Sequence, residues 1–310
     1  MSLHDQEYLN HVQTILNDGY KKEDRTENGT VSLFGTQNVY DLKHGFPLLT
    51  VRELGFKTIL RELLWFIKGS TNIRGLVEAK CNIWNDDAYR FYTEVLNGKL
   101  SKEEFLEKCK AGEFSTPLEN GESYFYGDLG KVYGYQWNKP VISSTGKTLF
   151  PTQLDYVLDQ CLTNPNSRRI LLECWDPSDM LDQFTALPCC HTGFQCYVVG
   201  NRIDLKFNMR SNDVFLGAPF NIASYAILLQ MLCHLTGKVP GRIIHHTGDA
   251  HLYNGHLPFV EELLRRDTSI KSPLLFIKNR GQKRFHDFVE EDFELVGYNP
   301  LPKIQAPLFV

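Results

Sequence analysis

Apolar residues recur along this chain at intervals of three and four positions in several segments. This spacing puts the apolar side chains on one side of a helix, so it predicts helices at residues 8–16, 57–68, 153–161 and 221–235. Glycines follow two of these segments, at Gly69 and Gly237, and glycine is a common residue just beyond a helix end. Each helix therefore has one face suited to packing on a core.

Strict alternation of apolar and polar residues predicts strands elsewhere. Residues 202–210 alternate in this way, and Gly200-Asn201 separates them from another strand-like run at 194–199, which indicates a hairpin. One face of the second strand is then core, and the other carries Arg210 toward a polar surface. Shorter strands are predicted at 30–34, after the Asn28-Gly29 turn, and at 170–174.

Composition and charge limit the class of protein. The 310 residues are 42% hydrophobic and 23% charged, which allows a large core in one domain or two. The net charge of −4 gives no basic surface for nucleic acid, and no apolar run approaches the roughly 20 residues of a membrane span. The first ten residues also lack the layout of a signal peptide. We therefore expect a cytoplasmic protein that binds neither a membrane nor nucleic acid.

The cysteines and histidines do not indicate a metal site. In the cytoplasm the 8 cysteines are expected to be free thiols, and no two of them form a C-x-x-C pair. Four histidines lie close together in the sequence, at His245, His246, His251 and His256. Their spacings match no common ligand set, so we expect no metal.

Reactive chemistry is concentrated in two nearby segments. The first, TALPCCHTGFQCY at 185–197, contains adjacent cysteines, and a thiolate is the strongest nucleophile among side chains. The second, NMRSNDVFLGAPFNIASYA at 208–226, supplies an arginine beside a serine, a carboxylate and an amide at Asn221. Taken alone, the cysteines are also compatible with small buried core residues.

Together these segments resemble the signature of the thymidylate synthase family, and the resemblance extends from about Leu9 to Val310. The family places its nucleophile in a Pro-Cys-His context, which identifies Cys190 rather than Cys189. The resemblance implies an α+β fold: a single domain, 1–310, with a large twisted mixed sheet covered by helices on one face. The other face is expected to form a homodimer. Residues at about 88–122, which are polar and helix-prone, correspond to a small helical insertion.

The reaction implied by the resemblance is the reductive methylation of dUMP to dTMP. 5,10-Methylenetetrahydrofolate serves as co-substrate and donates both carbon and hydride, with a covalent bond between the cysteine and the pyrimidine and no metal. Uracil C5 is a poor nucleophile until a thiolate adds to C6, so a reactive cysteine suits this chemistry.

Residue roles follow from the same resemblance. Residues with catalytic roles are Cys190, Glu62, His191, Tyr133 and Asn221. The phosphate is held by Arg25, Arg210 and Ser211, together with Arg168 and Arg169 of the second subunit. Asn221 also reads the uracil, while His251 and Tyr253 bind the ribose hydroxyl. Asp213, Trp84, Gly217 and the C-terminal Val310 contact the folate, and the tail closes over it. Arg168 and Arg169 are predicted to lie on extended chain, where their side chains diverge.

Several positions depart from the family pattern. Met209 replaces a glutamine, Asp87 replaces a second tryptophan, and residues 51–55 replace a more basic segment. Asn212, within the stretch NMRSNDV, makes this segment similar to that of the deoxycytidylate hydroxymethylases. The alternative function is therefore a dUMP or dCMP 5-hydroxymethylase that uses the same folate and adds water in place of hydride. A cysteine hydrolase would leave the arginines unexplained, and an RNA-binding role lacks a basic surface.

Overall fold

The structure is a computed structural model that describes residues 2–23, 28–115, 123–180 and 185–309. Its α-helices are α1 Leu3–Asp18, α2 Phe56–Ile67, α3 Arg74–Glu78, α4 Asn85–Arg90, α5 Lys102–Ala111, α6 Tyr133–Trp137, α7 Gln153–Thr163, α8 Pro177–Met180, α9 Gly217–Thr236 and α10 Leu257–Leu264. Its strands are β1 Tyr20–Lys22, β2 Thr30–Asp41, β3 Val141–Ile142, β4 Thr148–Phe150, β5 Leu171–Glu173, β6 His191–Val199, β7 Arg202–Asp213, β8 Val239–Tyr253, β9 Leu274–Ile277 and β10 Phe293–Val296.

The chain divides into two compact units. The first comprises Met1–Ile59, Val157–Leu172 and Cys190–Val310, and the second comprises Leu60–Tyr156 and Glu173–Cys189. The prediction of one catalytic domain over 1–310 remains a prediction.

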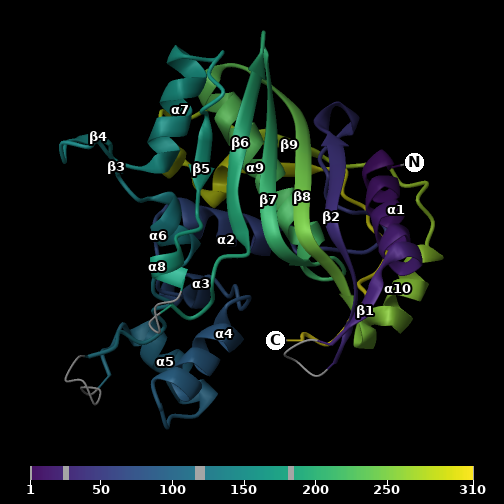
Figure 1. Ribbon diagram of the computed structural model, residues 1–310, viewed down its shortest axis with the longest axis horizontal. Coiled ribbons are helices and arrows are strands. Elements are labelled where there is room, and N and C mark those ends of the chain that lie inside the picture. Colours follow the sequence, from purple (N-terminus) through teal and green to yellow (C-terminus); the bar gives the residue numbers. More distant parts are fainter. Residues whose placement is uncertain (1, 24–27, 116–122, 181–184, 310) are drawn as a thin grey trace. The chain divides into compact units, whose positions relative to one another are not determined.

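A mixed sheet of 6 strands organises the first unit, in the order β1-β2-β8-β7-β6-β5 (Figure 1). The β6–β7 and β2–β8 pairs are antiparallel, whereas β7 and β8 are parallel. Adjacent parallel strands need a crossover connection, and α9 supplies it between β7 and β8. The predicted α+β class with a large mixed sheet is confirmed.

Helix α9 is the central helix of this unit. It packs against β7 and β8, and it ends at Gly237, whose φ of 67° is the left-handed conformation that glycine adopts without strain. Its length and apolar composition would also suit a membrane span, but 72% of its most apolar window is buried, as in a core helix. Among the described residues no other helix is both long enough and apolar enough to cross a membrane.

Helices cover one face of the sheet, and among the described residues no helix covers the other face, which is called the open face below (Figure 1). On the covered face α1 packs against β2, and the Tyr8 hydroxyl of α1 donates a hydrogen bond of 3.0 Å to the Val214 carbonyl. On the open face Val39, Tyr197 and Val199 remain 37%, 63% and 56% exposed. Exposed apolar side chains on a sheet face are typical of a surface that binds another protein chain.

The second unit is mostly helical. The segment predicted to be helical, 88–122, contains the second half of α4, a π-helical turn at Phe91–Val95 (η2) and α5; residues 116–122 lie outside the described residues. A capping box at Ser101 and Glu104 begins α5, and the left-handed Gly112 ends it. That this segment is an insertion remains a prediction.

The structure corrects the sequence interpretation in three places. Arg168 and Arg169 lie in a turn before β5, not on extended chain. Helix α9 begins at Gly217 rather than at residue 221, because Pro219 fits the first turn of a helix, where its missing N–H has no role. The 15-residue strand β8 was not predicted, because its polar residues interrupt the apolar alternation.

Candidate active site

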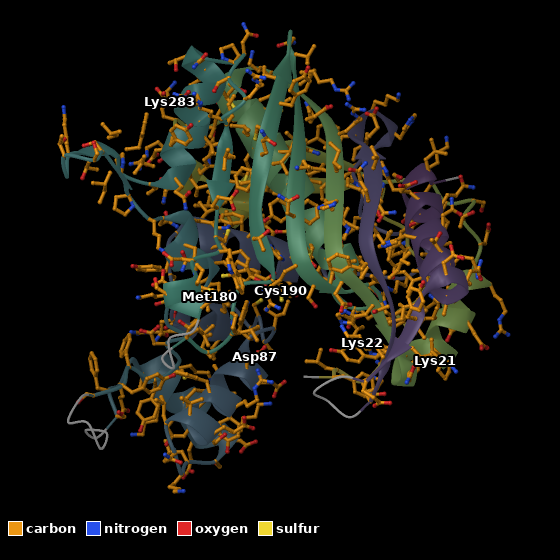
Figure 2. The ribbon with its side chains drawn as sticks, in the orientation of Figure 1. Lys21, Lys22, Asp87, Met180, Cys190 and Lys283 are labelled. Carbon is orange, nitrogen blue, oxygen red and sulfur yellow. The ribbon has the colours of Figure 1, made fainter. Side chains whose placement is uncertain are left out.

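Cys190 and Arg210 lie together at one end of the sheet. Cys190 directly precedes β6 (Figure 2). It is partly exposed, whereas Cys189 is fully buried. The Arg210 backbone N–H donates to the Cys190 carbonyl at 2.9 Å, and the Arg210 Nη2 atom lies 3.7 Å from the Cys190 sulfur. A guanidinium at this distance favours the thiolate form of cysteine over the thiol.

Gly248 of β8 allows this close approach of strands. A Cβ atom at this position would lie 2.7 Å from the Arg210 carbonyl oxygen, closer than real side chains come to backbone. Only glycine therefore fits beside Arg210 without moving β7, which fixes the arginine next to the cysteine.

His191 and Asn221 form a hydrogen-bonded pair. The Asn221 amide nitrogen lies 3.0 Å from His191 Nε2, so Nε2 is the acceptor and the ring proton is assigned to Nδ1. Burial lowers the pKa of His191 to about 3. This histidine is therefore neutral at physiological pH, and its neutral ring holds the Asn221 amide in one orientation.

Asp213 is the last residue of β7 and precedes the turn that leads into α9. Its Oδ1 atom accepts hydrogen bonds from the backbone N–H groups of Phe215 and Leu216 at 2.9 and 3.0 Å. Its Oδ2 atom has no hydrogen bond to any residue that the structure describes, so it is available to a ligand with N–H donors. Gly217 keeps this corner open, because a Cβ atom there would lie 3.1 Å from Asn212 Oδ1.

Asn212 and Met209 explain two of the departures from the family pattern. Asn212 is only 3% exposed, and its amide nitrogen lies 3.0 Å from the Met209 sulfur and 3.1 Å from His245 Nε2. The sulfur of Met209 thus accepts a hydrogen bond from Asn212 inside the core. Both contacts use the amide nitrogen of Asn212, so this end of the side chain is held inside the core.

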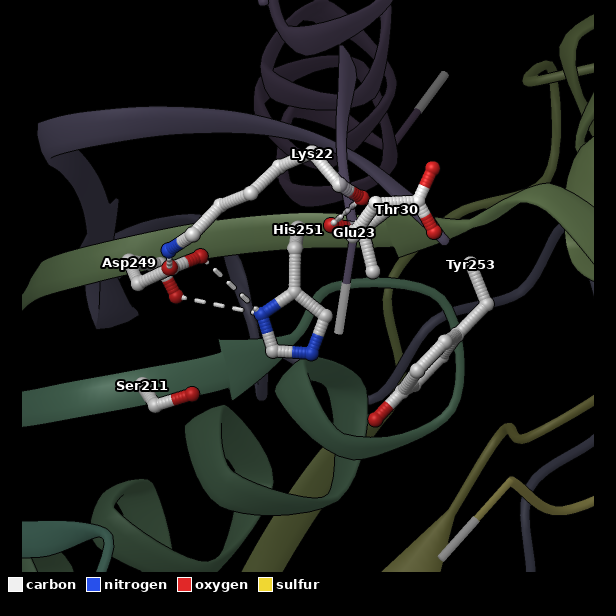
Figure 3. A pocket seen from close by; sticks show the side chains of 7 residues that line it. All are labelled: Lys22, Glu23, Thr30, Ser211, Asp249, His251 and Tyr253. Carbon is white, nitrogen blue, oxygen red and sulfur yellow. Dashed lines mark hydrogen bonds and ion pairs between the residues drawn. The ribbon is translucent and has the colours of Figure 1, made fainter. Parts of the chain in front are cut away.

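Figure 3 shows a pocket that is lined by Ser211, His251 and Tyr253. Lys22 of β1, Glu23 and Thr30 of β2 line the rest of it, together with Asp249. His251 Nδ1 lies 3.3 Å from Asp249 Oδ1, and Lys22 Nζ lies 2.9 Å from Asp249 Oδ2. The hydrogen bond from His251, with help from Lys22, lowers the pKa of Asp249 to about 2. The carboxylate holds the His251 proton on Nδ1 and leaves Nε2 facing the pocket.

Arg168 belongs to a different pocket. That pocket lies on the open face of the sheet, where Arg168 is joined by Tyr197, Lys206 and Arg242. Arg169 follows Arg168 in the turn before β5, and its backbone N–H donates to Ser167 Oγ at 3.1 Å. The structure of one chain therefore does not bring Arg168 to Ser211 and His251.

Within the second unit, Glu62 and Trp84 are in contact. The Trp84 indole N–H donates to Glu62 Oε1 at 2.8 Å, and the Trp84 ring lies 6.2 Å from that of Tyr133. Burial raises the pKa of Glu62 to about 7, and the hydrogen bond from Trp84 only partly offsets this. A carboxyl that titrates near neutral pH suits a group that exchanges protons with a substrate.

The C-terminal segment packs against other parts of the first unit. Leu301 donates its backbone N–H to Thr50 O at 2.8 Å, and the Phe309 ring lies 5.3 Å from the Tyr253 ring. Lys303 lines a third pocket together with Arg52, Glu53, Leu216 and Phe220. Arg52 itself is buried and stacks over Phe215 at 4.4 Å, so Lys303 is the more accessible cation there.

Sequence reasoning missed three residues of this site. Lys22 and Asp249 orient His251, and His256 contacts the C-terminal segment. His256 had been considered only as a metal ligand. Arg25 and Val310 lie outside the described residues. Within the described ranges, no cluster of three or more histidine, cysteine or carboxylate side chains is arranged to hold a metal ion.

Comparison with known proteins identifies the family. A family model described as thymidylate synthase matches residues 6–310. The chain is 42% identical over 307 residues to the thymidylate synthase of Mycoplasma mobile, covering 98% of this chain and 100% of that protein. It is 40% identical over 319 residues to that of Listeria monocytogenes, covering 98% and 99% of the two chains. The thymidylate synthase of Phytoplasma mali is 42% identical over 298 residues, covering 94% and 97%. With this match over almost its full length, the chain belongs to the thymidylate synthase family.

Proposed function

We propose that this enzyme converts dUMP to dTMP with 5,10-methylenetetrahydrofolate, through a covalent bond between Cys190 and the pyrimidine. The main support, beyond the family, is the placement of Arg210 Nη2 at 3.7 Å from the Cys190 sulfur. The experiment is direct: the protein is supplied with dUMP and the folate, the nucleotide product is weighed by mass spectrometry, and dihydrofolate is followed by absorbance. The expected product is heavier than dUMP by one CH2 unit, because a methyl group replaces the hydrogen on C5, and it forms with an equal amount of dihydrofolate.

In the proposed reaction the Cys190 thiolate adds to C6 of uracil, and the electron pair of the C5–C6 bond moves to make C5 an enolate carbon. C5 then attacks the methylene carbon of the co-substrate, and one of the two carbon–nitrogen bonds that hold this carbon opens. Loss of the C5 proton and release of tetrahydrofolate leave an exocyclic methylene. A hydride from tetrahydrofolate completes the methyl group, the cysteine is eliminated, and dihydrofolate is the second product. Glu62, Tyr133 and His191 serve the proton transfers.

Asn221 is proposed to recognise uracil. An amide offers one donor and one acceptor, which match O4 and N3–H of the base. Because His191 Nε2 accepts from the Asn221 nitrogen, the pair fixes which end of the amide faces the ligand. An amide alone could present either its oxygen or its nitrogen to the base. Because the neutral His191 fixes its orientation, Asn221 can select uracil.

The remaining substrate contacts are proposed as follows. Arg210, Ser211 and Arg25 bind the phosphate, since arginine matches phosphate oxygens with two parallel donors. His251 and Tyr253 bind the ribose hydroxyl. The free Oδ2 of Asp213 accepts N–H groups of the pterin, with Gly217, Trp84 and Val310 as further folate contacts. Lys303 is a suitable partner for the anionic tail of the folate.

We also propose that the enzyme is a homodimer formed through the open face of the sheet. Val39, Tyr197 and Val199 supply the exposed apolar surface on that face, and the Arg168 pocket lies there too. Arg168 and Arg169 then complete the phosphate site of the second subunit. This arrangement would give the two arginines a ligand that they do not reach within one chain.

The hydroxymethylase alternative has lost its main support. Asn212 was the residue that favoured it, and Asn212 is hydrogen-bonded in the core to Met209 and His245.

We further propose that 1–310 acts as one catalytic domain with an insertion at about 88–122, in the cytoplasm, and without a nucleic-acid or membrane partner.

A further inference from the structure

His256 is a buried residue to which the reaction assigns no role. It ends the short helical turn Asn254–His256 (η3) after β8, and it is 0% exposed. Its Nε2 atom lies 2.8 Å from the carbonyl oxygen of Pro307 in the C-terminal segment. A carbonyl only accepts hydrogen bonds, so Nε2 carries a proton and donates it to the tail.

Aromatic packing joins His256 to the same segment. The Phe309 ring lies 4.9 Å from the His256 ring, and Tyr253 packs edge-on against His256 at 5.6 Å. Gly255 gives Phe309 room, because a Cβ atom there would lie 2.5 Å from the Phe309 ring. The end of the chain is thus fitted to a surface that His256 and Tyr253 provide.

The opposite side of the ring faces Asp213. His256 Nδ1 lies 3.9 Å from Asp213 Oδ1, the oxygen that two backbone N–H groups already hold. The ring also packs on Phe215, with 5.1 Å between ring centroids. One side chain therefore touches the tail, the ribose-binding tyrosine and the turn that presents Asp213.

We propose that His256 is a positioning residue that couples docking of the C-terminal segment to the ligand-binding geometry of Asp213 and Tyr253. This inference rests on the proposed roles of Asp213 and Tyr253 in binding the substrates.

The physical basis is the cost of an unpaired buried donor. When the tail docks, the Pro307 carbonyl satisfies the His256 Nε2 proton and fixes the plane of the ring. When the tail leaves, that donor loses its partner and the ring is free to turn against Phe215 and Tyr253. Ligands that need Asp213 and Tyr253 in place therefore favour the docked tail, and by linkage the docked tail favours those ligands.

Two substitutions separate this role from simple packing. The amide nitrogen of a glutamine reaches about as far as histidine Nε2, whereas that of asparagine corresponds to Nδ1 and does not reach the tail. We expect His256→Asn to lower kcat/KM for the folate about tenfold and His256→Gln about twofold. Binding of dUMP alone should weaken by less than kcat/KM for the folate in both variants, because dUMP meets only Tyr253 of the two coupled residues. Equal losses in the two variants, at equal melting temperature, would overturn the proposal.

A double-mutant cycle tests the coupling itself. Truncation after Ala306 removes Pro307 and Phe309, and with them the partner of His256. If His256 acts through the tail, His256→Asn should reduce the activity of the truncated chain by less than about twofold. Additive losses would mean that His256 acts independently of the tail. If the unaltered enzyme forms no dTMP, the proposed function fails; if it does and the losses are additive, only this inference fails.

Discussion

Trp84 donates its indole N–H to Glu62 at 2.8 Å, which joins two residues that the sequence had assigned to separate tasks. Trp84 was expected to pack near the folate and Glu62 to organise proton transfers. The hydrogen bond means that a change at Trp84 also alters the carboxyl group. Because burial raises the Glu62 pKa to about 7 while this bond opposes the shift, removing the indole should raise that pKa further.

The raised pKa of Glu62 predicts a pH-dependent gain in stability on replacement. The carboxyl has an ordinary pKa of 4.5 and a pKa of about 7 in the folded protein. Below pH 4.5 it is protonated in both states, and as the pH rises to 7 the unfolded state loses its proton first, so the folded state loses stability. Glu62→Gln should therefore gain up to about 3 kcal/mol in unfolding free energy relative to wild type across that range.

Urea unfolding at pH 4.5, 5.5, 6.5 and 7.5 would measure the Glu62 effect, with pH values spanning the two pKa values. Glu294→Gln, on the exposed side of β10, provides the matched control. A difference between Glu62→Gln and wild type that does not change with pH would contradict the prediction.

Cys190 is predicted to be the nucleophile and Cys189 is not. Cys190→Ser should reduce turnover about a thousandfold or more, because a hydroxyl is a far weaker nucleophile at neutral pH. Cys189→Ser should retain most turnover, although the buried site will lower its stability. Tandem mass spectrometry of the adduct with a 5-fluoropyrimidine nucleotide locates the bond; attachment to Cys189 would refute the assignment.

Much of the fold follows from local patterns. Alternation in residues 202–210 and the Gly200-Asn201 turn gave the β6–β7 hairpin, and the apolar spacing gave most of α9. Strand β8 was not foreseen because it carries His245, His246 and Asp249 among its apolar residues. His245 Nε2, for example, lies 3.1 Å from the Asn212 amide nitrogen of β7 and 2.9 Å from the Thr247 hydroxyl of β8, so hydrogen bonds inside the sheet offset part of the cost of burying this ring.

The sequence named candidate residues for the site but not the residues that orient them. Resemblance named Cys190, Arg210, Asn221 and His251 by their motifs. Lys22 and Asp249 were missed because they act through His251, and only the pairing of β8 with its neighbours brings them together. His256 was missed because its partner, Pro307, lies 51 residues further along the chain. Contacts of this kind depend on tertiary structure and leave no local pattern.

Asn221→Asp is predicted to shift the substrate preference from dUMP toward dCMP. An ionised carboxylate only accepts hydrogen bonds, which suits the amino group of cytosine. The same change places an acceptor 3.0 Å from His191 Nε2, so the histidine must move its proton to that nitrogen. Competition between the two nucleotides measures the preference. An unchanged ratio would count against Asn221 as the base-reading residue.

The homodimer with shared sites predicts complementation between inactive variants. An Arg169→Ala subunit keeps Cys190, and a Cys190→Ser subunit keeps Arg169, so one site of each hybrid dimer receives both groups. Random exchange of equal amounts makes half the dimers hybrids, and activity should reach about a quarter of the wild-type value. Native mass spectrometry verifies the exchange. Hybrids that form without any activity would rule out the shared site.

Trp84 is predicted to decide between methyl and hydroxymethyl products. After the folate has delivered its carbon, the exocyclic methylene accepts either hydride or water, and the outcome depends on how dry the site remains. Trp84→Phe keeps an aromatic ring while losing the bond to Glu62, whereas Trp84→Gly loses both. If the ring excludes water, the glycine variant should release hydroxymethyl nucleotide without equal dihydrofolate, and the phenylalanine variant should form mainly dTMP. Similar partition in both variants would assign the effect to the Glu62 hydrogen bond instead of to packing.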